Sequence, residues 1–434
     1  MKIRIRRVNK NELLLSIYVF FAIFSPPFVP YVNLVVVLFS GLLILMKYRY
    51  IFMKIICYTQ IFNWIKIWEI FYIWCITVIF INMLFFQDIV QIDHYVTLFN
   101  KFTVLLVVVV IDCGFVLCVV EKYGYGKNFL IKLVINAGLI ESITVVLAFL
   151  SPTIKSFFVQ LMGKNTGASL YSNHWFVTVR SYGFASTLVD VYGLGIAIIA
   201  GICFSYGILY EKRYIIYSFF IAFSTALNSR TGLVLYAIFI ILSSGYIMIK
   251  IRSLMKKVRL GVALCLSGIA LLIAYKLISK NEFTATWISS GLDSIMGFIK
   301  QSDTSTDYFA VASNDSYWEL PTGIRLLIGT GHSRFAAKGY SHTDNGYVND
   351  IWLSGILGCI MLYGGILKMV YSIWMNTRES LVKIGVLIIT LGFIIFNVKG
   401  GVINGTIGGI TFFMVLFFLN YIQVCEYKID KKYE

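Results

Sequence analysis

The chain has 434 residues, of which 59% are hydrophobic and only 13% are charged. Soluble globular domains carry about 25% charged residues, so this composition excludes an ordinary soluble protein. Apolar runs recur along the whole chain, many of them near the roughly 20 residues with which a helix crosses a bilayer. Because the runs are continuous rather than short and alternating, they predict an all-α polytopic membrane protein and exclude a transmembrane barrel.

The apolar runs predict about twelve spans within one integral-membrane domain, 1–434. The first run resembles a signal peptide but has no small-residue cleavage site, so we interpret it as an uncleaved span. The seventh and eighth are short and join in a tight hairpin through Asn228-Ser229-Arg230-Thr231. In chain order, the twelve predicted spans lie at about 12–29, 32–46, 68–86, 102–120, 129–150, 188–210, 214–228, 231–249, 259–278, 347–370, 382–397 and 403–423.

The formal net charge of +16 could indicate a nucleic-acid partner, but the positive charges sort by loop. Most of the 37 lysines and arginines fall in segments that share a side with the N-terminus, as the positive-inside rule describes for cytoplasmic loops. We therefore expect no nucleic-acid partner, both termini in the cytoplasm, and long outer-face loops at 151–187 and 279–346. The four histidines, His94, His174, His332 and His342, then all lie outside. The chemistry is expected at the outer face.

Two acidic residues, Asp112 and Glu141, fall within predicted spans. Ionisable residues inside a membrane are costly and often mark an ion path. These two would support a transporter, although each is isolated in its own span.

Two arginines lie at the outer ends of predicted spans. Arg180 comes shortly before the sixth span, and Arg230 lies in the hairpin between the seventh and eighth. A guanidinium can hold phosphate through two parallel hydrogen bonds, which makes both residues candidate anion contacts. The alternative for each is an arginine that reaches the lipid headgroups.

The segment 321–358 carries the chain's densest set of groups able to bind an anion and move a proton. Arg325 and Arg334 flank the glycine-rich stretch Gly329-Thr330-Gly331-His332, which predicts tight turns and lacks the spacing of a nucleotide-binding loop. Each arginine is either an anion contact or a solvated loop charge.

His342 comes directly before the tenth span, and histidine is the side chain that ordinarily changes charge near neutral pH, so it is a candidate base. The residues that follow, Thr343, Asp344 and Asn345, could instead cap the helix by accepting from its first N–H groups. Four scattered histidines without a spaced carboxylate or cysteine predict no metal site.

Three short motifs resemble the superfamily of O-antigen polymerases and ligases. Asn228-Ser229-Arg230-Thr231-Gly232 is similar to the family's Ser-Arg-small element, and Arg180-Ser181-Tyr182-Gly183-Phe184 to an Arg-x-x-Gly-Phe element in the preceding outer loop. The order of Arg325, the glycine-rich turn, His342-Thr343-Asp344-Asn345-Gly346-Tyr347 and Gly355 resembles the last large outer loop of the family. The predicted span layout agrees, so the resemblance covers most of the chain.

The resemblance implies a polymerase of the bacterial inner membrane, with its active site facing the periplasm or cell exterior. Such an enzyme moves a glycan from undecaprenyl pyrophosphate onto another lipid-linked repeat unit. The alternatives are a ligase of the same superfamily and a flippase or transporter for lipid-linked oligosaccharides. A chain-length regulator and a flippase are the protein partners that the resemblance implies.

The resemblance also implies a metal-independent inverting glycosyltransferase without a cofactor. Arg230 and Arg325 would hold the pyrophosphate, and His342 would take the proton from the acceptor hydroxyl. The further substrate contacts expected are Arg180, Arg334, Asp344, Asn345 and Tyr347.

Overall fold

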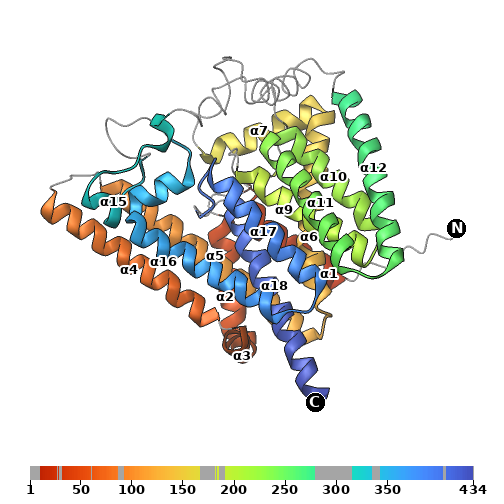
Figure 1. The fold of residues 1–434 in the computed structure, drawn as a ribbon, viewed down its shortest axis with the longest axis horizontal. Coiled ribbons are helices and arrows are strands. Elements are labelled where there is room, and N and C mark those ends of the chain that lie inside the picture. The colour runs from red at the N-terminus through yellow and green to blue at the C-terminus, as the bar shows by residue number, and fades with distance from the viewer. Residues whose placement is uncertain are drawn as a thin grey trace.

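The computed structural model describes a helical membrane protein (Figure 1). It describes residues 10–26, 28, 32–59, 61–86, 92–166, 181, 183–184, 191–278, 315–334, 343–403 and 407–433. Within these residues there is no strand, and nine helices are long and apolar enough to cross a membrane. The prediction of an all-α polytopic membrane protein is therefore confirmed at the level of fold class.

The helices follow the predicted spans closely, and each of the twelve spans overlaps one of them. Nine spans coincide with the nine long apolar helices, and the other three overlap α1, α10 and α12. Helices α1 and α10 have 15 and 16 residues, which at 1.5 Å per residue is shorter than a bilayer core of about 30 Å. The count of twelve spans stays a prediction. The helices are α1 (Lys10–Phe24), α2 (Val32–Leu43), α3 (Arg49–Thr59), α4 (Ile61–Phe85), α5 (Ile92–Tyr123), α6 (Asn128–Leu150), α7 (Pro152–Thr166), α9 (Val191–Leu209), α10 (Arg213–Asn228), α11 (Arg230–Lys250), α12 (Leu254–Ile278), α15 (Ile324–Ile328), α16 (Gly346–Asn376), α17 (Ser380–Asn397) and α18 (Ile407–Tyr433).

Helix α9 is the centre of the fold. Its membrane-spanning stretch is buried along its whole length, and α6, α10, α11, α17 and α18 pack against it. Small residues permit this close packing, since interhelical van der Waals contact drives helix association in a membrane. A Cβ atom at Gly201 would lie 3.0 Å from Phe239 of α11. The core therefore depends on α9 presenting small side chains to its neighbours.

The ends of the helices form two groups of contacts, at opposite ends of the bundle. At one end Lys127, before α6, pairs with Glu379 before α17 at 2.8 Å and with Glu426 of α18 at 3.4 Å. At the other end the turn before α11 contacts the α17–α18 connection, where Lys399 donates to Thr231 at 2.8 Å. We call these the Lys127 end and the Arg230 end. Loops predicted to lie on one side of the membrane thus contact one another.

Asp112 lies buried where α5 meets α1 and α2. Tyr18 Oη and Ser40 Oγ both donate to Asp112 Oδ1, at 2.6 and 2.9 Å. These hydrogen bonds join three helices, which is how buried polar groups are normally accommodated. Asp112 is thus part of the packing between α1, α2 and α5.

Helix α16 is broken at Gly355, nine residues after it begins. The backbone there has φ +67° and ψ 179°, a conformation open essentially only to glycine. The loop after α15 fills the break, and a Cβ atom at Gly329, itself at φ +90°, would lie 2.5 Å from the Gly355 nitrogen. Two glycines in the same unusual conformation therefore meet backbone to backbone.

Three carbonyl groups of α16 directly before the break accept hydrogen bonds from outside the helix. A break in a membrane helix requires other donors, because lipid supplies none. The donors come from the loop after α15 and from α4: Thr330 N and Oγ1 to Trp352 O at 2.6 and 2.8 Å, Gly331 N to Leu353 O at 3.0 Å, and Trp74 Nε1 to Ser354 O at 2.7 Å. The glycine-rich stretch bends at Gly331 and His332, and its hydrogen bonds complete a broken helix.

Candidate functional site

The turn between α10 and α11 has the tight hairpin geometry that its sequence predicts. Ser229 is extended, with φ −141° and ψ 116°, and its Oγ accepts from the Gly232 nitrogen at 3.2 Å. This is the N-cap arrangement that a helix start favours. A Cβ atom at Gly193 of α9 would lie 2.3 Å from Ser229 Oγ, so the turn sits directly on α9. Arg230 is the first residue of α11, and its side chain lies outside the described residues.

The second arginine motif is bound to this same turn. Ser181 N donates to Leu227 O at 3.1 Å, and Asn228 Nδ2 donates to Ser181 O at 3.0 Å. Ser181 Oγ also donates to Val145 O of α6 at 2.7 Å. Arg180 itself lies outside the described residues. The residue after it, Ser181, is hydrogen-bonded to Asn228, which comes two residues before Arg230 in the sequence. Two motifs that the sequence left unconnected are therefore joined.

Glu141 lies beneath the Arg180 motif. Its carboxylate accepts from Phe184 N at 3.1 Å and from Tyr192 Oη at 3.1 Å. A Cβ atom at Gly183 would lie 2.6 Å from Glu141 Oε1, so the backbone at Gly183 packs directly against the carboxylate. This buried acid therefore anchors the segment that follows Arg180.

Lys399 is a residue of this region that the sequence analysis did not single out. It lies in the short connection between α17 and α18, and its Nζ donates to Thr231 Oγ1 at 2.8 Å. The sequence signal is a lone lysine in a short predicted outer segment, where the positive-inside rule disfavours cations. The structure thus adds a cation beside the first turn of α11.

A buried polar network links the start of α16 to the same connection. Tyr363 Oη donates to Asp350 Oδ2 at 2.5 Å, and Asn397 Nδ2 donates to Tyr363 Oη at 3.0 Å. Asp350 and Tyr363 lie on the two sides of the Gly355 break. Asn397 is two residues before Lys399, so the network connects the two halves of α16 to the Lys399 segment. Sequence reasoning did not select any member of this network.

The residues after His342 form the start of α16. Asn345 is the N-cap and accepts from Val348 N at 3.2 Å, so the capping alternative is confirmed for Asn345. Asp344 is exposed, and Tyr347 Oη donates to Ile394 O at 2.9 Å. His342 lies outside the described residues. The substrate contacts predicted for Asp344, Asn345 and Tyr347 stay predictions.

Arg334 is buried in an ion pair. Its side chain is 0% exposed, and Nη2 lies 2.7 Å from Glu319 Oε2. Trp352 Nε1 also donates to Glu319 O at 3.0 Å, so the pair fastens the loop to the first half of α16. The sequence allows two interpretations of Arg334, an anion contact or a solvated loop charge. Its burial excludes the solvated loop charge.

Arg325 lies on the α4 side of the same loop, on the short helix α15. Its guanidinium carbon is 4.4 Å from the centre of the Phe86 ring, a cation–π geometry. Figure 1 places α15 and α11 on opposite sides of α17. The described contacts therefore bring the turn before Arg230 together with Ser181 and Lys399, and they place Arg325 against Phe86.

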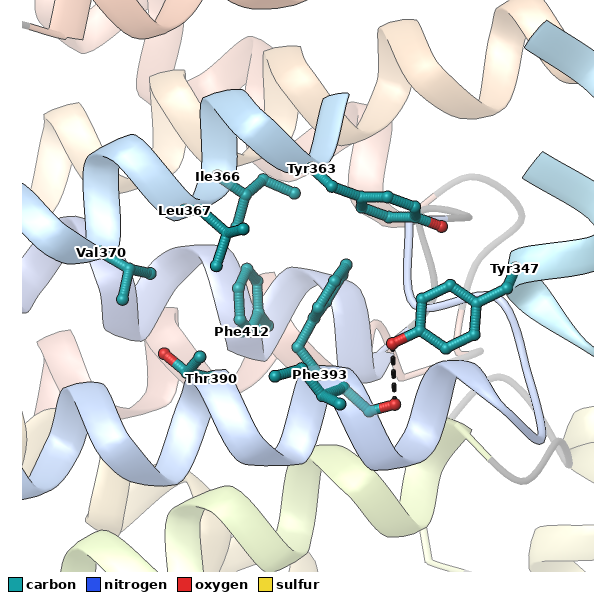
Figure 2. A pocket seen from close by; sticks show the side chains of 9 residues that line it. Tyr347, Tyr363, Ile366, Leu367, Val370, Thr390, Phe393 and Phe412 are labelled. Atoms are coloured by element: carbon teal, nitrogen blue, oxygen red, sulfur yellow. Dashed lines mark hydrogen bonds between the residues drawn. The ribbon is translucent and has the colours of Figure 1, made fainter. Parts of the chain in front are cut away.

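An apolar cavity of about 200 Å³ lies between α16, α17 and α18 (Figure 2). Tyr347 and Tyr363 form one end, and Val370 and Thr390 lie at the other. A cavity of 150 Å³ lined by apolar side chains can hold a benzene molecule, so this one can hold an apolar group. Tyr363 connects the cavity to Asn397, which places apolar space beside the polar network.

No group of three or more histidine, cysteine or acidic side chains suited to a metal occurs in the part of the chain that the structure describes. The prediction that the protein uses no metal concerns its chemistry and stays a prediction.

Comparison of the chain with protein-family models gave no match, and comparison with curated protein sequences gave none either. The resemblance to O-antigen polymerases and ligases therefore rests on the short motifs and the span layout.

Proposed function

We propose that the protein is a glycosyltransferase that polymerises lipid-linked oligosaccharide repeat units at the outer face of a bacterial cytoplasmic membrane. The observation that supports this most is the joining of two arginine motifs at one turn. Ser181, next to Arg180, is hydrogen-bonded to Leu227 and Asn228, three and two positions before Arg230. Two arginines carried by joined motifs at a membrane edge suit a substrate whose leaving group is a lipid pyrophosphate.

In this proposal the acceptor hydroxyl of one repeat unit attacks the anomeric carbon of another glycan. The new C–O bond forms as the bond to pyrophosphate breaks, and the lipid pyrophosphate leaves with the electron pair. His342 accepts the hydroxyl proton, a contribution typically of roughly 10²–10⁴ in rate. A single displacement of this kind inverts the anomeric configuration.

Arg230, supported by Arg180, is proposed to stabilise the charge that develops on the leaving pyrophosphate. Fixed charges in a site with little water are usually the largest single contribution to catalysis. Arg325 remains a proposed substrate contact on the α4 side of the loop. Of the remaining proposed contacts, Arg334 acts through its pair with Glu319, by holding the loop in place.

The apolar cavity between α16 and α17 also supports a lipid-linked substrate. A lipid pyrophosphate combines a polar head with a hydrocarbon chain, and the cavity adjoins a polar network through Tyr363.

Deleting the gene and locating the lipid-linked sugars that accumulate tests the proposal. A polymerase predicts single repeat units in the outer leaflet, because substrate is delivered and not consumed. Accumulation in the inner leaflet would contradict it in favour of a flippase. Finished polymer retained on the lipid carrier would contradict it in favour of a ligase.

A further inference from the structure

The apolar cavity between α16, α17 and α18 has a continuous aromatic wall (Figure 2). The ring centres of Tyr347 and Tyr363 lie 5.6 Å apart, and those of Tyr363 and Phe393 lie 5.8 Å apart. The rings of Phe393 and Phe412 follow at 5.2 Å. Aromatic pairs favour separations of about 4.5–7 Å, so each ring holds its neighbour in place. The cavity is therefore preformed by contacts among its own lining residues.

The hydroxyl groups that line the cavity already have hydrogen-bond partners. Tyr347 Oη donates to Ile394 O at 2.9 Å, and Thr390 Oγ1 donates to a backbone carbonyl one turn earlier in α17 at 2.7 Å. Tyr363 Oη donates to Asp350. The other lining side chains are apolar. Apolar cavities stay dry and bind apolar molecules, so this lining selects hydrocarbon.

The cavity opens on the lipid-facing side of the bundle. Of its lining residues, Leu367 and Ile394 are 54% and 45% exposed, whereas Phe412 is 0% exposed. The two exposed side chains belong to helices that are long and apolar enough to cross a membrane, where the exposed surface faces hydrocarbon. A hydrocarbon chain can therefore enter the cavity sideways from the bilayer.

Along α17 the cavity lies close to the Arg230 end of the bundle. Thr390 and Ile394 come seven and three residues before Asn397, where the helix ends. At about 1.5 Å per residue, they lie about 10 and about 5 Å from that end. Asn397 Nδ2 donates to Tyr363 Oη at 3.0 Å, so the cavity adjoins the α17–α18 connection, which contacts the first turn of α11. The cavity is thus in the half of the bilayer next to the Arg230 turn.

We infer that this cavity binds the isoprene units nearest the pyrophosphate of the lipid carrier and selects them over the straight acyl chains of the bilayer. The inference rests on the proposed function and names the part of the protein that recognises the lipid. A chain whose pyrophosphate lies at the Arg230 turn passes this depth of the bilayer. An isoprene unit is branched and has a flat double bond, so it fills a wide cavity and packs on ring faces better than a straight chain does.

Two probes with the same head group test this selection on the purified full-length chain. They are farnesyl pyrophosphate and a straight-chain alkyl pyrophosphate of equal carbon number. We expect wild type to bind the isoprenoid roughly 10-fold more tightly, the effect of burying about two further methylene-sized groups. Because the head groups are identical, this ratio reports the chain alone.

Filling the cavity should remove the preference. Val370→Phe adds a ring at the end of the cavity opposite the two tyrosines, and the two probes should then bind with nearly equal affinity. Ile360→Phe is the matched control, because Ile360 is an exposed residue of α16 outside the lining, and it should keep the wild-type ratio. Should Val370→Phe fail to fold, Thr390→Phe fills the cavity from α17, with the same result expected.

The inference and the proposed function fail separately in this experiment. Equal affinity of wild type for the two chains, or an unchanged preference in whichever filling variant folds, overturns the inference even where the protein makes polymer. A preference that disappears on filling supports the inference even where the wild-type protein joins no repeat units, a result that would contradict only the proposed joining reaction.

Discussion

Replacement of Arg230 by alanine is expected to leave cells with single repeat units and no long polymer. Loss of one fixed donor to a developing negative charge costs on the order of 10²–10³ in rate, about 2.7–4 kcal/mol. Arg230 begins α11 at a turn held by Ser229, Gly193 and Ser181, so the backbone that carries this charge is held in place. The measurement is the length distribution of surface polysaccharide at equal membrane abundance of the two proteins.

Two further variants make this result specific. Arg230→Lys should also be impaired, because an ammonium cannot reproduce two parallel hydrogen bonds to one phosphate. Arg252→Ala is the matched control, since Arg252 is exposed two residues beyond the opposite end of α11, and it should make normal polymer. A normal ladder of chain lengths from Arg230→Ala would exclude this arginine from the site.

Replacement of Gly355 by alanine is expected to destabilise the protein by more than about 3 kcal/mol. A backbone conformation reserved for glycine costs about 1–3 kcal/mol in other residues. The added Cβ atom would also lie 2.2 Å from Leu327 O and 2.5 Å from Gly329 N, which are backbone atoms with little freedom to move. The loop should separate from the break, and thermal unfolding in detergent should report the loss.

Gly364→Ala provides the comparison on the same helix. No heavy atom lies within 4 Å of a Cβ atom built there, and alanine favours helix over glycine by about 1 kcal/mol. This variant should be as stable as wild type or slightly more so. Equal thermal stability of the Gly355 and Gly364 variants would show that the break does not depend on glycine.

The sequence pattern was sufficient to predict the helices and one part of the candidate site. Hydrophobic runs predicted the spans because lipid requires continuous apolar helices, and the small polar residues around Arg230 predicted a hairpin that the structure confirms. The capping alternative for Asn345 followed from the same local chemistry. All three depend on contacts between residues close in the chain.

The remaining features depend on residues far apart, which a single sequence does not connect. Lys399 and Thr231 are separated by 168 positions, and nothing in either segment indicates their contact. The partner of Arg334 was equally hidden, because Glu319 becomes its neighbour only when the loop folds against the broken helix. Gly355 can be seen in the sequence, but the break that it makes in α16 depends on the loop after α15, which fills that break.

The two intramembrane acids show the same limit. An acid in a predicted span indicates a polar environment, and the sequence could not say whether that environment is a pathway or a packing contact. Asp112 joins α1, α2 and α5, and Glu141 supports the segment after Arg180. Both acids therefore have hydrogen-bonding partners of the kind that a structural role requires.

Reconstitution of the purified chain in liposomes with a lipid-linked repeat unit tests the central claim most directly. The proposal predicts that glycan chains lengthen with release of one lipid pyrophosphate for each new glycosidic bond, and that Arg230→Ala slows this release by on the order of 10²–10³. Liposomes in which the repeat units move between leaflets while every glycan keeps its original length would contradict it.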